Sequence, residues 1–174
     1  CALATRKLFV KTRELFGKKR NIIMDMDGTL ADSMPFWKNS AREYAILRGA
    51  DIPDNFDEIT GVMDLNDYAE YVKNVLGIDT NLEQITEAAV EIMNKHYEKD
   101  IPAKDGMTEL VTREYKAGSR LVVFTASDRR SVEILLSHLG IRECFYDIYT
   151  VYDVGLKKSD KNSYLKVAEL AGMK

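Results

Sequence analysis

The sequence is poor in cysteine and has no long apolar run, and each absence excludes a class of protein. Only two cysteines, Cys1 and Cys144, occur among 174 residues. A disulfide framework is therefore excluded, and we expect both to be free thiols in a reducing compartment. No apolar run approaches the length of a membrane span. Basic residues interrupt every short apolar run between Leu3 and Phe16, so this segment does not resemble a secretory signal. Together these absences predict a cytoplasmic protein.

The sequence also lacks a strong charge of one sign and has few histidines. Its formal net charge is −3, which indicates neither a nucleic-acid partner nor an anionic membrane. Basic residues nevertheless gather in residues 1–20, where apolar residues recur at helical spacing, and this pattern predicts a basic amphipathic helix. That helix either packs on the domain, or binds a membrane surface or a partner that the sequence does not identify. His96 and His138 have no companion ligands nearby, so we expect neither to bind a metal or to act in catalysis.

Hydrophobic periodicity changes twice along the chain. Residues 21–24 suit a buried strand, residues 34–99 suit three successive helices, and residues 107–172 alternate between helix and strand, with strands expected at 120–125 and 146–151. This order predicts an α/β fold, with a Rossmann-like parallel-sheet core and an inserted all-helical cap. The predicted domains are an N-terminal helix at 1–20, a core at 21–33 and 104–174, and a cap at 34–103.

Polar residues follow the predicted strands. Asp25 and Asp27 come after the first strand, Thr125 ends the second, and the third leads toward Lys157 and Lys158. Ligands bind beyond the carboxyl ends of parallel strands, so these side chains are expected to meet there. A carboxylate can attack phosphorus, a second can move protons, and the pair can hold Mg²⁺. A hydroxyl and an ammonium group can balance the charge on phosphoryl oxygens.

The sequence resembles the haloacid dehalogenase (HAD) superfamily of hydrolases, and three segments carry the resemblance. The segment IIMDMDGTLADS is similar to the first family motif, a strand followed by D-x-D-G-T-[LV]. LVVFTAS is similar to the second motif, a strand that ends in Ser or Thr. VGLKKSDKNSYLKVAELAGM matches the third motif when its lysine is Lys158, which puts Tyr164 at the aromatic position and Ser159 in place of a proline. Lys157 is the alternative lysine.

The resemblance implies a role for each motif residue. Asp25 would be the nucleophile and a magnesium ligand. Asp27 would be the general acid and base, and its backbone carbonyl would bind the metal. Thr125 and Lys158 would bind the transferring phosphoryl group. The helical insertion is similar to the cap of the β-phosphoglucomutase-like branch, and the second acid at Asp27 argues against a dehalogenase.

Three further segments allow alternative interpretations. Gly61 lies where related caps carry a substrate-specificity loop, and Asp64 or Asn66 could contact substrate there or begin a helix. Phe36 and Trp37 could line a pocket or pack in the core. Arg129 and Arg130 could meet an anionic substrate or lie in solvent.

The expected activity is a Mg-dependent phosphatase that hydrolyses a small phosphorylated metabolite through an aspartyl phosphate. A phosphomutase of sugar phosphates and an inactive HAD-like binding module are the alternatives. The family's fourth motif, one or two acids on a further strand, has no counterpart before Lys174. The chain opens on Cys1 rather than Met. We therefore expect the sequence to be a piece of a longer protein, with its sheet incomplete at the carboxyl end and one metal-binding acid missing.

Overall fold

The computed structural model describes residues 19–63 and 65–173, so nearly all of the predicted N-terminal helix, residues 1–18, lies outside the described residues. The chain divides into a core unit, residues 19–31 and 103–173, and a helical unit, Asp32–Pro102. The described elements are, in chain order, β1 (Asn21–Met24), α2 (Met34–Leu47), α3 (Phe56–Thr60), α4 (Leu65–Asn74), α5 (Leu82–Lys99), α6 (Met107–Lys116), β2 (Arg120–Thr125), α7 (Arg129–His138), η1 (Arg142–Cys144), β3 (Asp147–Thr150), α8 (Val151–Val154) and α9 (Lys161–Leu170).

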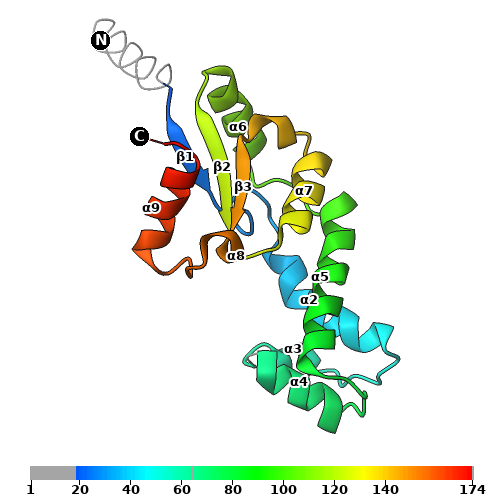
Figure 1. Cartoon of the computed structure of the whole chain (residues 1–174). Coiled ribbons are helices and arrows are strands. Elements are labelled where there is room, and N and C mark those ends of the chain that lie inside the picture. Colours follow the sequence, from blue (N-terminus) through cyan, green and yellow to red (C-terminus); the bar gives the residue numbers. More distant parts are fainter. Residues whose placement is uncertain (1–18, 64, 174) are drawn as a thin grey trace, which may run out of the picture. The chain divides into compact units, whose positions relative to one another are not determined.

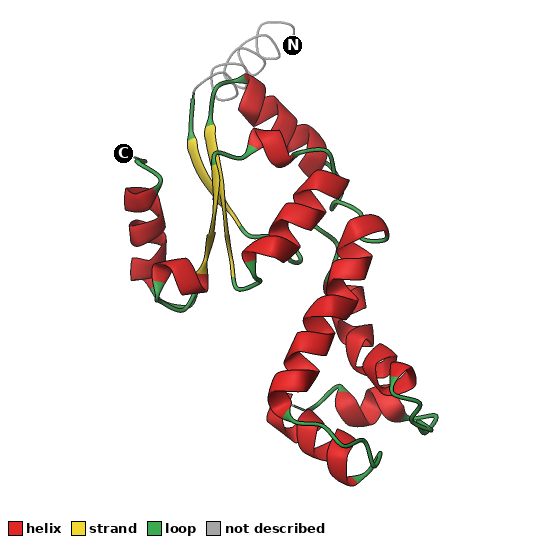
Figure 2. Cartoon of the chain, turned by 45° about the vertical axis from the view of Figure 1, so that its right-hand side comes forward, coloured by secondary structure: helices red, strands yellow, loops and turns green. Residues whose placement is uncertain are grey.

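The core unit contains a three-stranded sheet in the order β1-β2-β3, with both pairs of neighbours parallel. Met24 at the end of β1 pairs with Val123. Thr125 at the end of β2 pairs with Thr150 at the end of β3. All three strands therefore end at the same edge of the sheet. The predicted α/β fold, with a helical region between the first and second strands, is confirmed (Figures 1 and 2).

Helices cover both faces of this sheet, and the side chains of β2, which point alternately to the two faces, are buried on both. Val122 and Phe124 are buried in one cluster with Val167 of α9. Leu121 and Val123 are also fully buried, and their side chains point to the opposite face because successive residues of a strand alternate. Figure 1 shows α9 on one face and α6 and α7 on the other. This two-sided burial explains why β2 is an unbroken apolar run.

The helical unit has its own core, in which α2 packs along α5. Tyr44, Phe56, Tyr68 and Ile85 are among its buried side chains. Helix α5 begins with a capping box. The side chain of Asn81 accepts a hydrogen bond from the backbone N–H of Gln84, and the side chain of Gln84 accepts one from the backbone N–H of Asn81. The described segments contain no helix long and apolar enough to cross a membrane.

The structure corrects the sequence-based prediction in the short elements. Val151 was expected to end a strand, but it begins helix α8 because Thr150 caps that helix with its side chain. Helix α7 begins at Arg129, where Asp128 caps it by accepting a hydrogen bond from the N–H of Ser131. The short elements α3 and η1 were not predicted.

Candidate active site

The four predicted site residues come from three places at the carboxyl edge of the sheet. Asp25 and Asp27 follow β1, Thr125 ends β2, and Lys158 lies between α8 and α9. Because the strands are parallel and paired in register, the turns after β1 and β2 lie next to each other. The contacts below show which of these side chains meet.

Asp25 carries an ion pair at this edge. The ammonium group of Lys158 contacts its Oδ1 atom, and the backbone N–H of Met26 donates to the same oxygen at 2.8 Å. The side chains of Asp25 and Lys158 are 37% and 24% exposed, so a small molecule can reach both. Of the two adjacent lysines, it is Lys158, and not Lys157, that contacts the proposed nucleophile.

Buried apolar residues anchor the turn after β1. Met26 and Leu30 are fully buried, and the carbonyl of Met26 accepts hydrogen bonds from the N–H groups of Leu30 and Ala31 at 2.9 and 3.1 Å. Gly28 has a φ of 72°, a left-handed conformation that favours glycine. The DMDGTL sequence thus forms a tight turn whose buried members fix the backbone that carries the two acids.

Asp27 contacts a residue that sequence reasoning did not single out. The hydroxyl of Ser127 donates to Asp27 Oδ2 at 2.7 Å, across 100 residues of chain. The backbone N–H of Ser127 donates to Thr125 Oγ1 at 3.1 Å. Thr125 itself is only 1% exposed. The two residues after β2 therefore connect the second predicted motif with the first. A serine two positions after the strand-end threonine was the only signal available for this contact.

The segment that carries Lys158 is anchored on both sides. The ammonium group of Lys166 in α9 donates to the carbonyl of Val154 at the end of α8, at 2.9 Å. The ring of Tyr164 packs edge-to-face on Phe124 of β2, with centroids 5.2 Å apart. Helix α9 thus attaches the loop of residues 155–160 to both α8 and the sheet. Tyr164, which the resemblance placed at an aromatic motif position, contributes to this packing.

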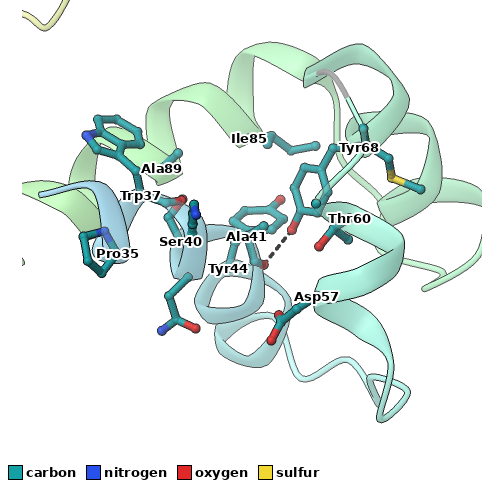
Figure 3. A pocket seen from close by; sticks show the side chains of 14 residues that line it. Pro35, Trp37, Ser40, Ala41, Tyr44, Asp57, Thr60, Tyr68, Ile85 and Ala89 are labelled. Carbon is teal, nitrogen blue, oxygen red and sulfur yellow. Dashed lines mark hydrogen bonds between the residues drawn. The ribbon is translucent and has the colours of Figure 1, made fainter. Parts of the chain in front are cut away.

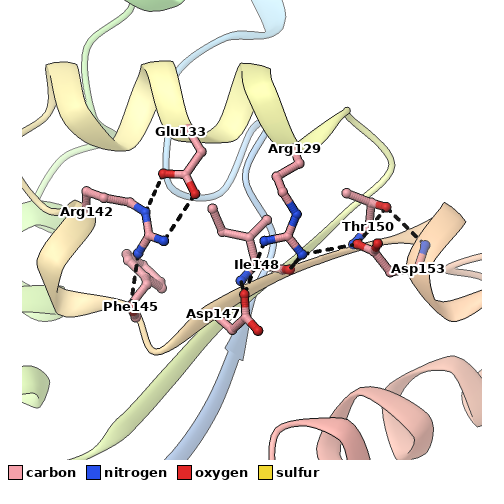
Figure 4. A network of polar contacts seen from close by, with 8 residues as sticks. All are labelled: Arg129, Glu133, Arg142, Phe145, Asp147, Ile148, Thr150 and Asp153. Carbon is pink, nitrogen blue, oxygen red and sulfur yellow. Dashed lines mark hydrogen bonds and ion pairs between the residues drawn. The ribbon is translucent and has the colours of Figure 1, made fainter.

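Arg129 contacts residues of β3 and α8 (Figure 4). Its guanidinium group pairs with Asp147 at 3.2 Å and Asp153 at 3.5 Å, and it also contacts the carbonyl of Ile148. The N–H of Thr150 donates to Asp153 Oδ2 at 2.8 Å. This backbone hydrogen bond, supported by the charge of Arg129, lowers the pKa of Asp153 below its usual value. Arg129 therefore stabilises the start of α8, and these contacts offset its charge within the core unit.

Two carboxylates are available at this edge for a metal ion. Asp25 and Asp27 provide the hard oxygen ligands that Mg²⁺ prefers, and Mg²⁺ is commonly held by one or two carboxylates together with water and phosphate oxygens. Among residues 19–63 and 65–173, no group of three acidic, histidine or cysteine side chains is placed to hold a metal. The donor set fits a magnesium site that takes its remaining ligands from water and substrate.

The helical unit contains a pocket of its own, with a volume of about 710 Å³ (Figure 3). Its lining comes from α2, α3, α4 and α5, and it includes Gly61, where the resemblance predicted a specificity loop. The hydroxyl of Tyr68 donates to the carbonyl of Ala41 at 2.7 Å, and Tyr44 is bonded to Thr80 at 2.9 Å. These bonds satisfy both tyrosine hydroxyls, so the aromatic rings present a mainly apolar wall. The predicted contacts of Asp64 fall on a residue outside the described ones.

Trp37 and His96 belong to the same unit. Trp37 lines the pocket, and its indole N–H donates to the hydroxyl of Tyr97 at 3.1 Å. His96 lies between two carboxylates, with Nε2 2.9 Å from Glu43 and Nδ1 2.8 Å from Asp100. The two ring nitrogens face different acids, so the histidine connects α2 with α5 through ion pairs.

Comparison with solved structures finds the same fold in several bacterial proteins. A candidate β-phosphoglucomutase from Thermotoga maritima has a TM-score of 0.73 and 20% identity, over 89% of this chain and 72% of that one. CbbY from Rhodobacter sphaeroides, solved with xylulose-(1,5)bisphosphate, has a TM-score of 0.64 and 23% identity, over 88% and 73% of the two chains. The candidate HAD hydrolase YfnB from Bacillus subtilis, solved with magnesium, has a TM-score of 0.66 and 16% identity, over 87% and 74%.

Sequence comparison gives the family. Comparison with curated proteins finds no match. The family model described as "Haloacid dehalogenase-like hydrolase" matches residues 22–174, which include β1, the helical insertion and every predicted site residue. This match extends over well more than half of the chain. The chain therefore belongs to the haloacid dehalogenase-like hydrolase family.

Proposed function

We propose that the protein is a magnesium-dependent phosphatase that hydrolyses a small phosphorylated metabolite through an aspartyl-phosphate intermediate. The observation that carries the proposal is the contact between the ammonium group of Lys158 and the carboxylate of Asp25, at the sheet edge where Thr125 also ends its strand. A carboxylate that reacts with phosphorus needs a nearby cation to offset the charge of the phosphoryl oxygens. The contact supports Lys158 as the source of this positive charge.

The proposed first step transfers the phosphoryl group to the protein. A carboxylate oxygen of Asp25 attacks phosphorus, a new O–P bond forms, and the bond from phosphorus to the alcohol oxygen breaks. Asp27 in its acid form gives a proton to that oxygen, so the alcohol leaves neutral and Asp27 becomes a carboxylate. Lys158 and the hydroxyl of Thr125 donate hydrogen bonds to the phosphoryl oxygens.

The proposed second step restores the enzyme. Asp27 takes a proton from a water molecule as the water oxygen attacks phosphorus. The bond between phosphorus and Asp25 breaks, inorganic phosphate leaves, and both acids return to their starting forms. When bound, Mg²⁺ would supply positive charge beside the phosphoryl oxygens, held by the carboxylate of Asp25 and the backbone carbonyl of Asp27.

The substrate class is proposed at the level of a small phosphomonoester. CbbY was solved with a sugar bisphosphate, and this ligand supports a test that begins with phosphorylated sugars. A general aryl phosphate, p-nitrophenyl phosphate, adds a probe whose hydrolysis does not depend on recognition of a particular alcohol.

The test measures inorganic phosphate released from these compounds with and without Mg²⁺. Asp25→Asn keeps the size of the side chain but removes the nucleophile, so we expect it to abolish Mg²⁺-dependent release while the circular dichroism spectrum stays unchanged. Asp79→Asn, at an exposed aspartate of the helical unit, is the matched control and should keep full activity. Retained activity in Asp25→Asn would remove this residue from its role. Isomerisation of a sugar phosphate without phosphate release would replace the phosphatase by a mutase, and a lack of either activity would favour a binding module.

A further inference from the structure

Ser127 donates two hydrogen bonds, each to a proposed site residue. Its hydroxyl donates to Asp27 Oδ2 at 2.7 Å, and its backbone N–H donates to Thr125 Oγ1 at 3.1 Å. It lies just after β2, in the turn next to the one that carries the acids. None of the three sequence motifs assigns a role to this serine.

The geometry points to Ser127 as the positioning residue for Asp27, an inference that rests on the proposed phosphatase function. Asp27 follows β1 in a turn, and a carboxylate on such a turn can rotate about its side-chain bonds. A hydroxyl donor at 2.7 Å favours one orientation, because rotating the carboxyl group away would break this hydrogen bond. Proton transfer needs that orientation, since a general acid works only within hydrogen-bond reach of the leaving oxygen.

The two acids accept hydrogen bonds from different donors. Asp25 is held by an ammonium group and a backbone N–H. Asp27 accepts a hydrogen bond from the hydroxyl of Ser127 on Oδ2. A hydroxyl can remain bonded to a carboxyl group in either protonation state by turning its hydrogen. Ser127 thus suits an acid that loses and regains a proton in each cycle.

Ser127→Ala makes a clean test because it deletes one atom. The backbone N–H that bonds Thr125 remains, so only the hydrogen bond to Asp27 is lost. A matched control is Ser131→Ala. Ser131 also donates its hydroxyl to an aspartate, Asp128, at 2.6 Å, but that pair caps α7 and does not include a proposed site residue.

The readout is kcat/KM for substrates that differ in their need for a general acid. An alkyl phosphate has a poor leaving group and depends on proton donation, whereas p-nitrophenyl phosphate has a good one and depends on it little. We expect Ser127→Ala to lower kcat/KM about 10-fold for glycerol phosphate and less than about 3-fold for p-nitrophenyl phosphate. The 10-fold loss is a tenth or less of the full rate factor that a general acid contributes. Ser127→Thr, which keeps the hydroxyl, should restore the wild-type ratio, and Ser131→Ala should leave it unchanged.

A double-mutant cycle separates positioning from a general structural role. If Ser127 acts through Asp27, Ser127→Ala has no further effect on the ratio in an Asp27→Asn background. Equal losses for both substrates, or additive losses in the cycle, would overturn the inference about Ser127. The proposed function would still stand if the wild-type protein showed phosphatase activity. An inactive wild-type protein would overturn both.

Discussion

At the scale of single residues, the carboxyl edge of the sheet depends on small differences between neighbouring side chains. Lys157 and Lys158 are adjacent in sequence, yet Lys158 contacts Asp25, whereas Lys157 is exposed. The loop is anchored by α9, so its backbone determines which of the two ammonium groups points toward the acid. The two lysines therefore form a natural pair of test and control.

We predict that Lys158→Met lowers kcat/KM for p-nitrophenyl phosphate by about 10²–10³-fold, the loss expected when a group that stabilises developing charge is removed. Lys157→Met should change it less than about 2-fold, because a solvated lysine contributes little to a site that it does not contact. Steady-state kinetics on both variants checks the prediction. Comparable losses in the two variants would show that the lysines act as a diffuse positive charge and not through one specific contact.

At the scale of elements, α2 and α5 are connected by an ion-paired histidine. Burial lowers the pKa of His96, but its hydrogen bonds to Glu43 and Asp100 and their negative charges outweigh this effect. The net result is a pKa above the usual 6.5. The ring of Phe36 also packs on the imidazole, with centroids 5.0 Å apart. Protonated His96 therefore attracts Glu43 on α2 and Asp100 just after the end of α5.

The sign of the pH dependence follows from this raised pKa. The stabilisation is fully present below pH 6.5, and it is lost as the pH rises through the pKa of the folded state. We predict that His96→Gln lowers the free energy of unfolding by about 0.5–1 kcal/mol at low pH and by less at high pH. Denaturant titrations at about pH 5.5 and about pH 8.5 measure the difference. His138→Gln, at the exposed histidine of α7, is the control, and an equal effect of the two substitutions would contradict the prediction.

Long elements could be predicted from the sequence, and short ones could not. The bounds of α6 and β2 follow from a clear apolar period ended by a glycine or by a strand-end threonine. Helix α8 is only four residues long, and its start depends on the capping box between Thr150 and Asp153. A four-residue segment shows no helical period, so the sequence pattern places its first residue, Val151, in the preceding strand.

At the scale of the whole chain, the candidate site could be predicted only in part. Asp25, Asp27, Thr125 and Lys158 belong to recognisable motifs, and the parallel sheet brings the turns that carry them to one edge. Ser127 has no such signal. Its contact with Asp27 joins residues 100 positions apart and depends on which strands pair and in what register, information that local patterns do not contain.

The two ends of the helical unit meet each other, and this has a consequence for folding kinetics. The N–H of Asp32 donates to the carbonyl of Pro102 at 3.0 Å. In the unfolded chain, nearly a hundred residues separate β1 from β2. Once the helical unit has folded, its two ends lie together, so only a short flexible connection remains between the two strands. Closing the shorter loop costs less chain entropy, by on the order of 1 kcal/mol. The insertion then acts as an intramolecular clip that speeds the pairing of β1 with β2.

Trp37, the single tryptophan of the chain, lies in the helical unit and reports its folding. We predict that during refolding its fluorescence reaches the native value before the amides of Val122 and Phe124 in β2 become protected from hydrogen exchange, because contacts between distant residues form late. Stopped-flow fluorescence and pulsed hydrogen exchange measure the two events. Ile92→Ala, which removes a buried side chain of the helical core, should delay both. Protection of β2 that kept its wild-type rate would mean that the strands find each other without the clip.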